Sequence, residues 1–280
     1  PAAARGPLPE AQPHGPHALH RPTLEGAGSA MPAVYLRPDR AEPGPAVLYC
    51  HAHGNSYATG AEELTRGRPA LQAPYGPALA ALGIASLSID LAPFGARQHE
   101  GPEGALAKAG LWQGRPLMGA MLAELAAALG WLAARPEIDA DRIATLGLSM
   151  GGTHAYWLAA LDPRVAACAH LCVFADIAPL IASGAHDLHG PYLSVPGLLA
   201  EGDMGDVATL VAPRPQHVAL GAEDPLTPEP ARNAAIARLR AGYAAAPDRL
   251  ALHIAPGTGH AETARMRADT LEFLQRHLQP

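Results

Sequence analysis

The sequence predicts an α/β fold, a doubly wound and mostly parallel sheet with helices on both faces. Short apolar runs alternate with longer runs of helical composition along most of the chain. Strands that are apolar throughout belong to sheets that are covered on both faces. The chain has 280 residues, of which 49% are hydrophobic, so it has enough apolar side chains for one sizeable core.

The expected elements follow a regular order after an irregular start. Residues 1–22 are rich in Pro, His and Ala without any period, which predicts an extended N-terminal arm. A short pair of strands is expected over 23–38. Buried strands are expected over 46–50, 84–90, 142–148, 165–174, 216–221 and 250–255. Helices are expected over 75–83, 117–134, 151–161, 231–246 and 262–278. No repeat or linker interrupts this order, so we expect 23–280 to be a single domain.

One segment breaks the alternation of strands and helices. Residues 175–213 contain several glycines and prolines with apolar patches between them. A long irregular insertion in an otherwise regular fold is often a pocket wall or a lid. We therefore expect residues 175–213 to cover the functional site.

Charge and cysteine content limit the functional classes. The net charge of −6 argues against nucleic acid or an anionic membrane as a partner, because both require a basic patch. No apolar stretch has the length of a membrane span, and the N-terminal residues lack the apolar core of a secretory signal. Cys50, Cys168 and Cys172 lie in apolar runs, and we expect them to be reduced core residues of a cytoplasmic protein.

The stretch TLGLSMGG lies where an expected strand meets an expected helix, and it predicts a nucleophile. Gly147-Leu148-Ser149-Met150-Gly151 matches the G-x-S-x-G pattern, in which a serine sits on a sharp strand-to-helix turn. Glycines are needed beside the serine because larger side chains would clash with neighbouring elements. A tight turn without any chemistry is the alternative, and the strand before and helix after favour the nucleophile.

A serine hydroxyl needs a base to become an effective nucleophile. In this architecture the chain order is serine, then acid, then histidine. Asp224 follows the strand expected over 216–221, and His260 follows the last strand, so both are expected beside Ser149 at the carboxyl edge of the sheet. His260 would be the general base, and Asp224 would hold its tautomer. The structural alternatives are a turn residue for Asp224 and a helix cap for His260. Other candidates for the acid are Glu223, Asp90 and Asp176.

Two backbone N–H groups are expected to bind the oxyanion of the tetrahedral intermediate. One belongs to Met150, at the N-terminus of a helix. The other is expected from HAHGNSY, the loop after strand 46–50, where Gly54 lets the backbone turn toward the site. The N–H of Asn55 is the candidate.

Further side chains are candidates for contact with a substrate: His53, Tyr57, Arg97, Trp112 and His186. Arg97 follows a strand end and could bind a carboxylate, with a structural ion pair as the alternative. Trp112 could roof an acyl pocket or pack in the core. His53 is expected to order the oxyanion loop by hydrogen bonding, and His186, with His189, to line the pocket or be solvated. No H-E-x-x-H motif or paired Cys/His spacing is present, so no metal site is predicted.

The chain resembles the α/β-hydrolase superfamily, and within it the bacterial hydrolases similar to dienelactone hydrolase and acetyl xylan esterase. The stretches that carry the resemblance are VLYCHAHGN, SIDLAPFGAR, EIDADRIATLGLSMGG, LDPRVAACAHLC, APRPQHVALGAEDPLTP and GTGH, which together span about 45–262. The resemblance implies the α/β-hydrolase fold and a catalytic triad. Dienelactone hydrolase itself has a cysteine nucleophile, whereas this chain has Ser149, and the superfamily hosts many substrates on one scaffold.

We therefore expect a serine hydrolase that cleaves a carboxylic ester or lactone of a small molecule through an acyl-Ser149 intermediate, without a cofactor. A peptidase or amidase, or an acyltransferase, would use the same triad. A non-catalytic binding protein of the same fold is a further alternative, which the whole triad disfavours. The sequence leaves the acyl and alcohol groups open, and it is compatible with a homodimer.

Overall fold

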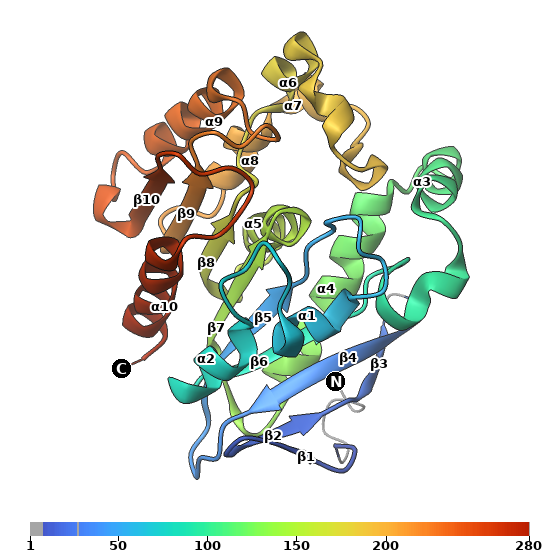
Figure 1. Ribbon diagram of the computed structural model, residues 1–280, viewed down its shortest axis with the longest axis vertical. Coiled ribbons are helices and arrows are strands. Elements are labelled where there is room, and N and C mark those ends of the chain that lie inside the picture. The colour runs from blue at the N-terminus through green and yellow to red at the C-terminus, as the bar shows by residue number, and fades with distance from the viewer. Residues whose placement is uncertain (1–7, 27, 280) are drawn as a thin grey trace.

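One central sheet organises the molecule (Figure 1). The computed structural model describes residues 8–26 and 28–279, and within them ten strands form this sheet. The strands are β1 (Gln12–His14), β2 (His17–His20), β3 (Thr23–Gly26), β4 (Ser29–Arg37), β5 (Gly44–Cys50), β6 (Ala85–Ile89), β7 (Ile138–Leu148), β8 (Val165–Leu171), β9 (Gln216–Gly221) and β10 (Leu250–Ala255). Their order across the sheet is β1-β2-β4-β6-β5-β7-β8-β9-β10, and β3 pairs with β4.

The strands from β5 to β10 run parallel to one another. β5 pairs in parallel with β6 and β7, and β8, β9 and β10 continue on the β7 side. β4 is antiparallel to β2, β3 and β6. The predicted α/β fold with a mostly parallel sheet is confirmed, and its antiparallel strands are confined to the N-terminal part of the chain.

The N-terminal residues differ from the arm expected over 1–22. Residues 1–7 of that arm lie outside the described residues. β1 and β2 form an antiparallel hairpin that turns at Gly15, with φ +59°, and β2 joins the sheet beside β4. Leu19 is buried there. The two strands have only three and four residues, so their alternation is too short to be recognised against a Pro- and His-rich composition.

Helices cover both faces of the sheet (Figure 1). They are α1 (Glu63–Arg66), α2 (Tyr75–Ala81), α3 (Glu103–Trp112), α4 (Leu117–Ala133), α5 (Met150–Leu161), α6 (Ile177–Ser183), α7 (Leu198–Glu201), α8 (Met204–Thr209), α9 (Glu229–Gly242) and α10 (Ala264–Leu278). Short 3-10 turns are η2 (Gly60–Glu62), η3 (Gly95–Glu100), η4 (Ala185–Leu188), η5 (Pro191–Leu193) and η6 (Pro247–Arg249). Within the described ranges, no single helix is long and apolar enough to cross a membrane; α3 and α4 pass only as a pair bent by 97°.

The core lies in two layers, one on each face of the sheet. Successive residues of β5 alternate between them: Leu48 belongs to the layer with α4, α5 and α9, and Val47 to the layer with α1, α2 and α10. Every residue of β5 is buried, as is required of a central strand that is covered on both faces. The three cysteines are unpaired thiols inside these layers.

The segment expected to be irregular, residues 175–213, consists of short helices joined by turns. It holds α6, η4, η5, α7 and α8, and it leaves the sheet after the carboxyl end of β8. In Figure 1 α6 and α7 lie at the top of the molecule, above α5. The segment therefore stands over the edge at which the parallel strands end.

Candidate active site

Ser149 occupies the sharp turn between β7 and α5. Its backbone has φ 57° and ψ −128°, a conformation that costs a non-glycine residue free energy. A Cβ atom added to Gly151 would overlap the carbonyl oxygen of Cys50, and one added to Gly147 would overlap the backbone of Gly151. Only glycine therefore fits on either side of the serine. The strained turn raises the Ser149 hydroxyl above the carboxyl edge of the sheet.

A chain of hydrogen bonds joins Ser149, His260 and Asp224. The Oγ of Ser149 lies 2.9 Å from Nε2 of His260, and Nδ1 of His260 lies 2.7 Å from Oδ2 of Asp224. A carboxylate can only accept, so Nδ1 carries the proton and Nε2 is free to accept from the serine hydroxyl. The structure thus brings together three residues that are 36 to 111 positions apart in sequence.

The Asp224 side chain is fully buried, whereas the His260 side chain is 26% exposed. The second oxygen of Asp224 accepts the backbone N–H of Leu226 at 2.9 Å, so the carboxylate is fixed from both ends. The alternative acid Glu223 is exposed. Asp90 instead accepts the backbone N–H groups of Ala61 and Ala96, at 2.7 and 2.9 Å. The last alternative, Asp176, binds Arg238 at 2.9 Å.

The two expected oxyanion donors lie in different situations. Met150 is the first residue of α5, where backbone N–H groups have no partner within the helix. The N–H of Asn55, in contrast, donates to Nδ1 of His53 at 3.0 Å. Asn55 has φ 52°, and Gly54 has φ 50°, so the loop turns back on the ring of His53. The prediction for Asn55 did not anticipate that a neighbouring side chain already accepts its N–H.

His53 is a buried residue of the loop after β5, and both of its ring nitrogens are hydrogen bonded. Because Nδ1 accepts from Asn55, the proton is on Nε2, which donates to Oε2 of Glu103 at 2.8 Å. The hydroxyl of Tyr57 donates to the same oxygen at 2.9 Å, and the other oxygen accepts the backbone N–H of Tyr192 at 3.3 Å. His53 and Tyr57 therefore hold the loop through Glu103, and neither was predicted to meet a carboxylate.

Glu103 is the residue that sequence reasoning missed. It opens α3, and its side chain is 3% exposed. Burial alone would raise its pKa, but the hydrogen bonds from His53, from the hydroxyl of Tyr57 and from the backbone N–H of Tyr192 outweigh burial and hold the pKa below its usual value. A glutamate after a proline reads as an ordinary first-turn residue, and its partner lies 50 positions away. No local signal in the sequence indicates this contact.

Two of the expected substrate contacts, Arg97 and Trp112, have different surroundings from those the sequence predicts. The guanidinium of Arg97 is buried and paired with Glu100 and Glu124, at 2.5 and 2.7 Å, which is the structural ion pair that was the alternative. Trp112 is 88% exposed, so it neither packs in the core nor closes a pocket. A position after a strand end or at a helix start gives no information on which way a long side chain turns.

His186 lines a groove of about 640 Å³ under the segment 177–200, together with His189 and Leu111. Tyr57 and Glu103 line a smaller hollow of about 390 Å³.

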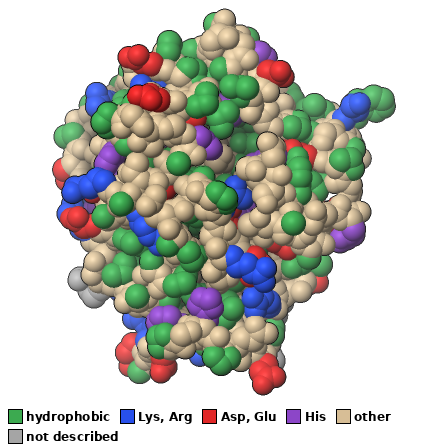
Figure 2. All heavy atoms as spheres, in the orientation of Figure 1, with side chains coloured by type: hydrophobic (Ala, Val, Ile, Leu, Met, Phe, Trp, Pro, Cys, Tyr) green, Lys and Arg blue, Asp and Glu red, His purple; other side chains and the backbone are tan. Residues whose placement is uncertain are grey.

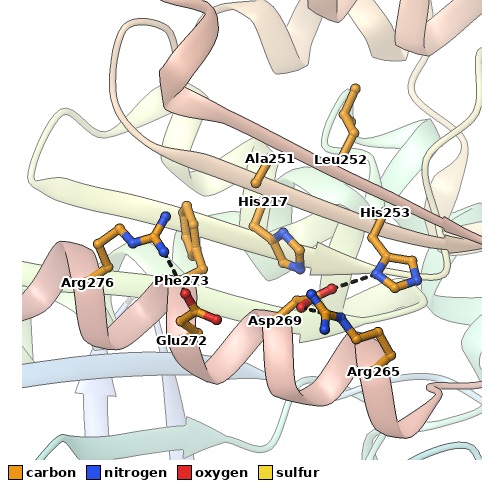
Figure 3. Close-up of a pocket in the computed structure, with 9 residues that line it drawn as sticks. All are labelled: His217, Ala251, Leu252, His253, Arg265, Asp269, Glu272, Phe273 and Arg276. Carbon is orange, nitrogen blue, oxygen red and sulfur yellow. Dashed lines mark hydrogen bonds and ion pairs between the residues drawn. The ribbon is translucent and has the colours of Figure 1, made fainter.

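A third hollow, of about 470 Å³, lies between β10 and α10 (Figure 3) and contains a second close His–Asp pair, His253 and Asp269 at 2.6 Å. Across residues 8–26 and 28–279, no group of three His, Cys, Asp or Glu side chains is arranged to hold a metal ion.

Similar proteins agree with this fold. A "Putative hydrolase YtaP" from Bacillus subtilis (strain 168) is 37% identical over 251 residues, which are 88% of this chain and 83% of the relative. An acetyl xylan esterase from Paenibacillus sp. R4 superposes with a TM-score of 0.70 at 20% identity, covering 97% of this chain and 88% of that one. A cold-adapted esterase from an Arctic intertidal metagenomic library gives 0.65 at 20% identity, covering 96% and 98%.

The family model described as "Dienelactone hydrolase family" matches residues 78–177, a stretch that contains β7, Ser149 and α5. The structural neighbours, at such low identity, show the shared fold alone. The Bacillus relative adds identity over most of both chains. The protein belongs to the dienelactone hydrolase family of α/β-hydrolases.

Proposed function

We propose that this protein hydrolyses a carboxylic ester or lactone of a small molecule, with Ser149 as the nucleophile. The observation that carries the proposal is the continuous hydrogen-bonded chain Ser149–His260–Asp224 on a strained elbow. Membership in a hydrolase family and the esterase neighbours support the ester as the bond that is cleaved. The proposed chemistry uses only side chains and backbone groups of this chain.

In the first half of the reaction, Nε2 of His260 takes the hydroxyl proton as Ser149 Oγ attacks the carbonyl carbon. The carbonyl oxygen becomes an oxyanion, and the bond to the leaving oxygen then breaks as His260 returns the proton to it. An alcohol departs, and an acyl-Ser149 ester remains. A lactone opens in the same way, but its hydroxyl end stays attached to the acyl group.

In the second half, water takes the place of the serine hydroxyl. His260 removes a proton from water, the hydroxide attacks the acyl carbon, and the proton returns to Ser149 Oγ as the acid is released. Asp224 stays ionised throughout, holds Nδ1–H in place and stabilises the imidazolium. The buried position of Asp224 fits this role, since little solvent competes for the hydrogen bond.

The N–H of Met150 is the oxyanion donor of the proposal, because it opens α5 directly after the nucleophile. Asn55 can join it only if the substrate oxygen shares or replaces Nδ1 of His53 as the acceptor. We therefore give His53 and Glu103 the role of positioning the loop that carries Asn55.

The test is hydrolysis of p-nitrophenyl acetate by the wild type and by Ser149→Ala, with circular dichroism to show that the variant is folded. We expect the rate to fall by at least about 10³-fold, since a triad without its nucleophile retains only residual catalysis. Undiminished hydrolysis by a folded Ser149→Ala protein would remove Ser149 from the mechanism.

A further inference from the structure

An open apolar groove lies under the covering segment and has no assigned role. It has a volume of about 640 Å³, and Leu111 at the end of α3 forms its far side. The covering segment supplies the rest of the lining, which includes the apolar side chains of Ile177, Ile181, Leu193, Val195, Leu198 and Leu199. Figure 2 shows hydrophobic side chains over the upper end of this face, where α6 and α7 lie in Figure 1.

The chemistry of the lining selects an uncharged apolar group. The lining contains no Lys or Arg to bind an anion, and no Trp, Tyr or Phe on which a sugar ring would stack. Three of its side chains leave much apolar surface in solvent: Leu111 is 41%, Ile181 50% and Leu199 46% exposed. Neighbouring exposed apolar residues in a hollow are typical of a ligand-binding site, because a bound apolar group removes them from water.

Two lining residues of the groove, His189 and Gly190, adjoin residues that hold the triad acid and the oxyanion loop. His189 lines the groove, and its Nε2 lies 3.0 Å from the carbonyl oxygen of Leu226, which is the residue whose N–H holds Asp224. Burial lowers the pKa of His189, which favours the neutral ring beside an apolar ligand.

Gly190, the next residue, packs against the oxyanion loop. A Cβ atom added there would lie 3.2 Å from Nε2 of His53 and 3.1 Å from Oε1 of Glu103. The groove therefore starts between the triad acid and the oxyanion loop and runs outward toward α3. An ester held at Ser149 would place one of its two substituents at this entrance.

On the basis of the proposed function, we propose that this groove is the subsite for the larger substituent of the ester, and that this substituent is a medium-length alkyl or other uncharged apolar group. Each methylene that becomes fully buried contributes about fourfold to kcat/KM when the contact is made in the transition state. A groove of this size admits several methylenes. The substrate class is thus esters with an apolar arm, rather than anionic or sugar esters.

The test measures kcat/KM for two series below their aggregation limits: p-nitrophenyl esters from acetate to octanoate, and alkyl acetates from methyl to octyl. The wild type is expected to gain at least about tenfold along one of the series. Leu199→Asp places a charge in the groove and is expected to remove at least about tenfold for the longest ester, with the shortest changed by less than about twofold. Leu210→Asp is the matched control, because Leu210 is 62% exposed and lies outside the groove lining.

The outcomes separate this inference from the proposed function. If the wild type hydrolysed none of these esters, the proposed function itself would be refuted. Hydrolysis without any gain along either series, or an equal effect of Leu199→Asp on short and long esters, would overturn the groove assignment alone. Faster cleavage of acetylated xylose than of the octyl substrates would overturn it as well. So would a wild-type dimer in size-exclusion chromatography that Leu199→Asp makes monomeric, because a second copy would then cover the groove.

Discussion

The molecule contains two close histidine–aspartate pairs, whose histidines are seven residues apart in the C-terminal part of the chain. His260, in the loop after β10, binds Asp224 at 2.7 Å, and His253, within β10, binds Asp269 of α10 at 2.6 Å. Figure 3 shows the second pair with Arg265 beside it. By distance alone the two pairs are equivalent.

Their surroundings differ in each respect that catalysis requires. The Asp224 side chain is fully buried, and its free oxygen accepts a backbone N–H, whereas Asp269 is 20% exposed and its other oxygen binds Arg265 at 2.8 Å. His260 reaches the Ser149 hydroxyl, whereas the hollow around His253 is lined by no Ser, Thr or Cys. A short histidine–carboxylate contact is therefore common to both a surface ion pair and a candidate catalytic dyad. The candidate catalytic dyad is distinguished by the Ser149 hydroxyl that His260 contacts and by the full burial of Asp224.

The largest effect is expected when the histidine of each pair is replaced in turn. His260→Ala is expected to reduce kcat for an activated ester by at least about 10³-fold, because the base is lost. His253→Ala is the matched control, and its kcat should stay within about twofold of the wild type. Both variants are compared by steady-state kinetics with circular dichroism as the check on folding. A near-normal rate in folded His260→Ala would make the triad assignment wrong, even if Ser149 remained essential.

A smaller effect is expected from the loop next to the triad. Glu103→Gln keeps the size of the side chain but leaves one oxygen to accept from His53, Tyr57 and the N–H of Tyr192. The loop that carries Asn55 would then be held less firmly, and we expect kcat to fall by about tenfold, less than the loss of an oxyanion donor outright. KM should change by less than about threefold.

The control for Glu103→Gln comes from the hollow of Figure 3, where Glu272 pairs with Arg276 at the surface. Glu272→Gln should leave both kcat and KM unchanged. A Glu103→Gln protein that lost activity only in proportion to its unfolded fraction would show a structural role alone. An unchanged kcat would show that the positioning role does not exist.

The sequence could predict features that depend on residues close together in the chain or on the order of the strand ends, and it could not predict other contacts between residues far apart in the chain. The elbow depends on residues within five positions of Ser149, and the strand ends carry Asp224 and His260, so pattern and chain order were enough to name them. The role of Glu103 depends on a contact across 50 positions, and the partner of the Asn55 N–H depends on the turn of a loop. The sequence indicates that Arg97 follows a strand end and that Trp112 lies at a helix start, but the direction of a long side chain is decided by tertiary packing.

The smallest expected effect tests whether the second pair only stabilises the fold. Burial is the largest single influence and would raise the pKa of Asp269, but the hydrogen bonds from His253 and Arg265 together outweigh it and lower the pKa. A carboxyl whose pKa is lowered by folding stabilises the protein above its unfolded value of about 4, and this contribution disappears as the pH falls through the folded value. Asp269→Asn should therefore lower Tm at pH 7 by at most about 3 °C, consistent with less than about 1 kcal/mol for a partly exposed pair.

That difference in Tm should shrink steadily as the pH is lowered from about 5 toward 2, with kcat for the activated ester unchanged at pH 7. Differential scanning calorimetry at several pH values gives the measurement. A difference that grows at low pH would have the wrong sign for a lowered pKa. A loss of activity in the folded variant would mean that the hollow between β10 and α10 communicates with Ser149, and that the two pairs are not independent. Independence is expected because the acid of each pair is fixed by its own partners, Leu226 for Asp224 and Arg265 for Asp269, and the two sets share no residue.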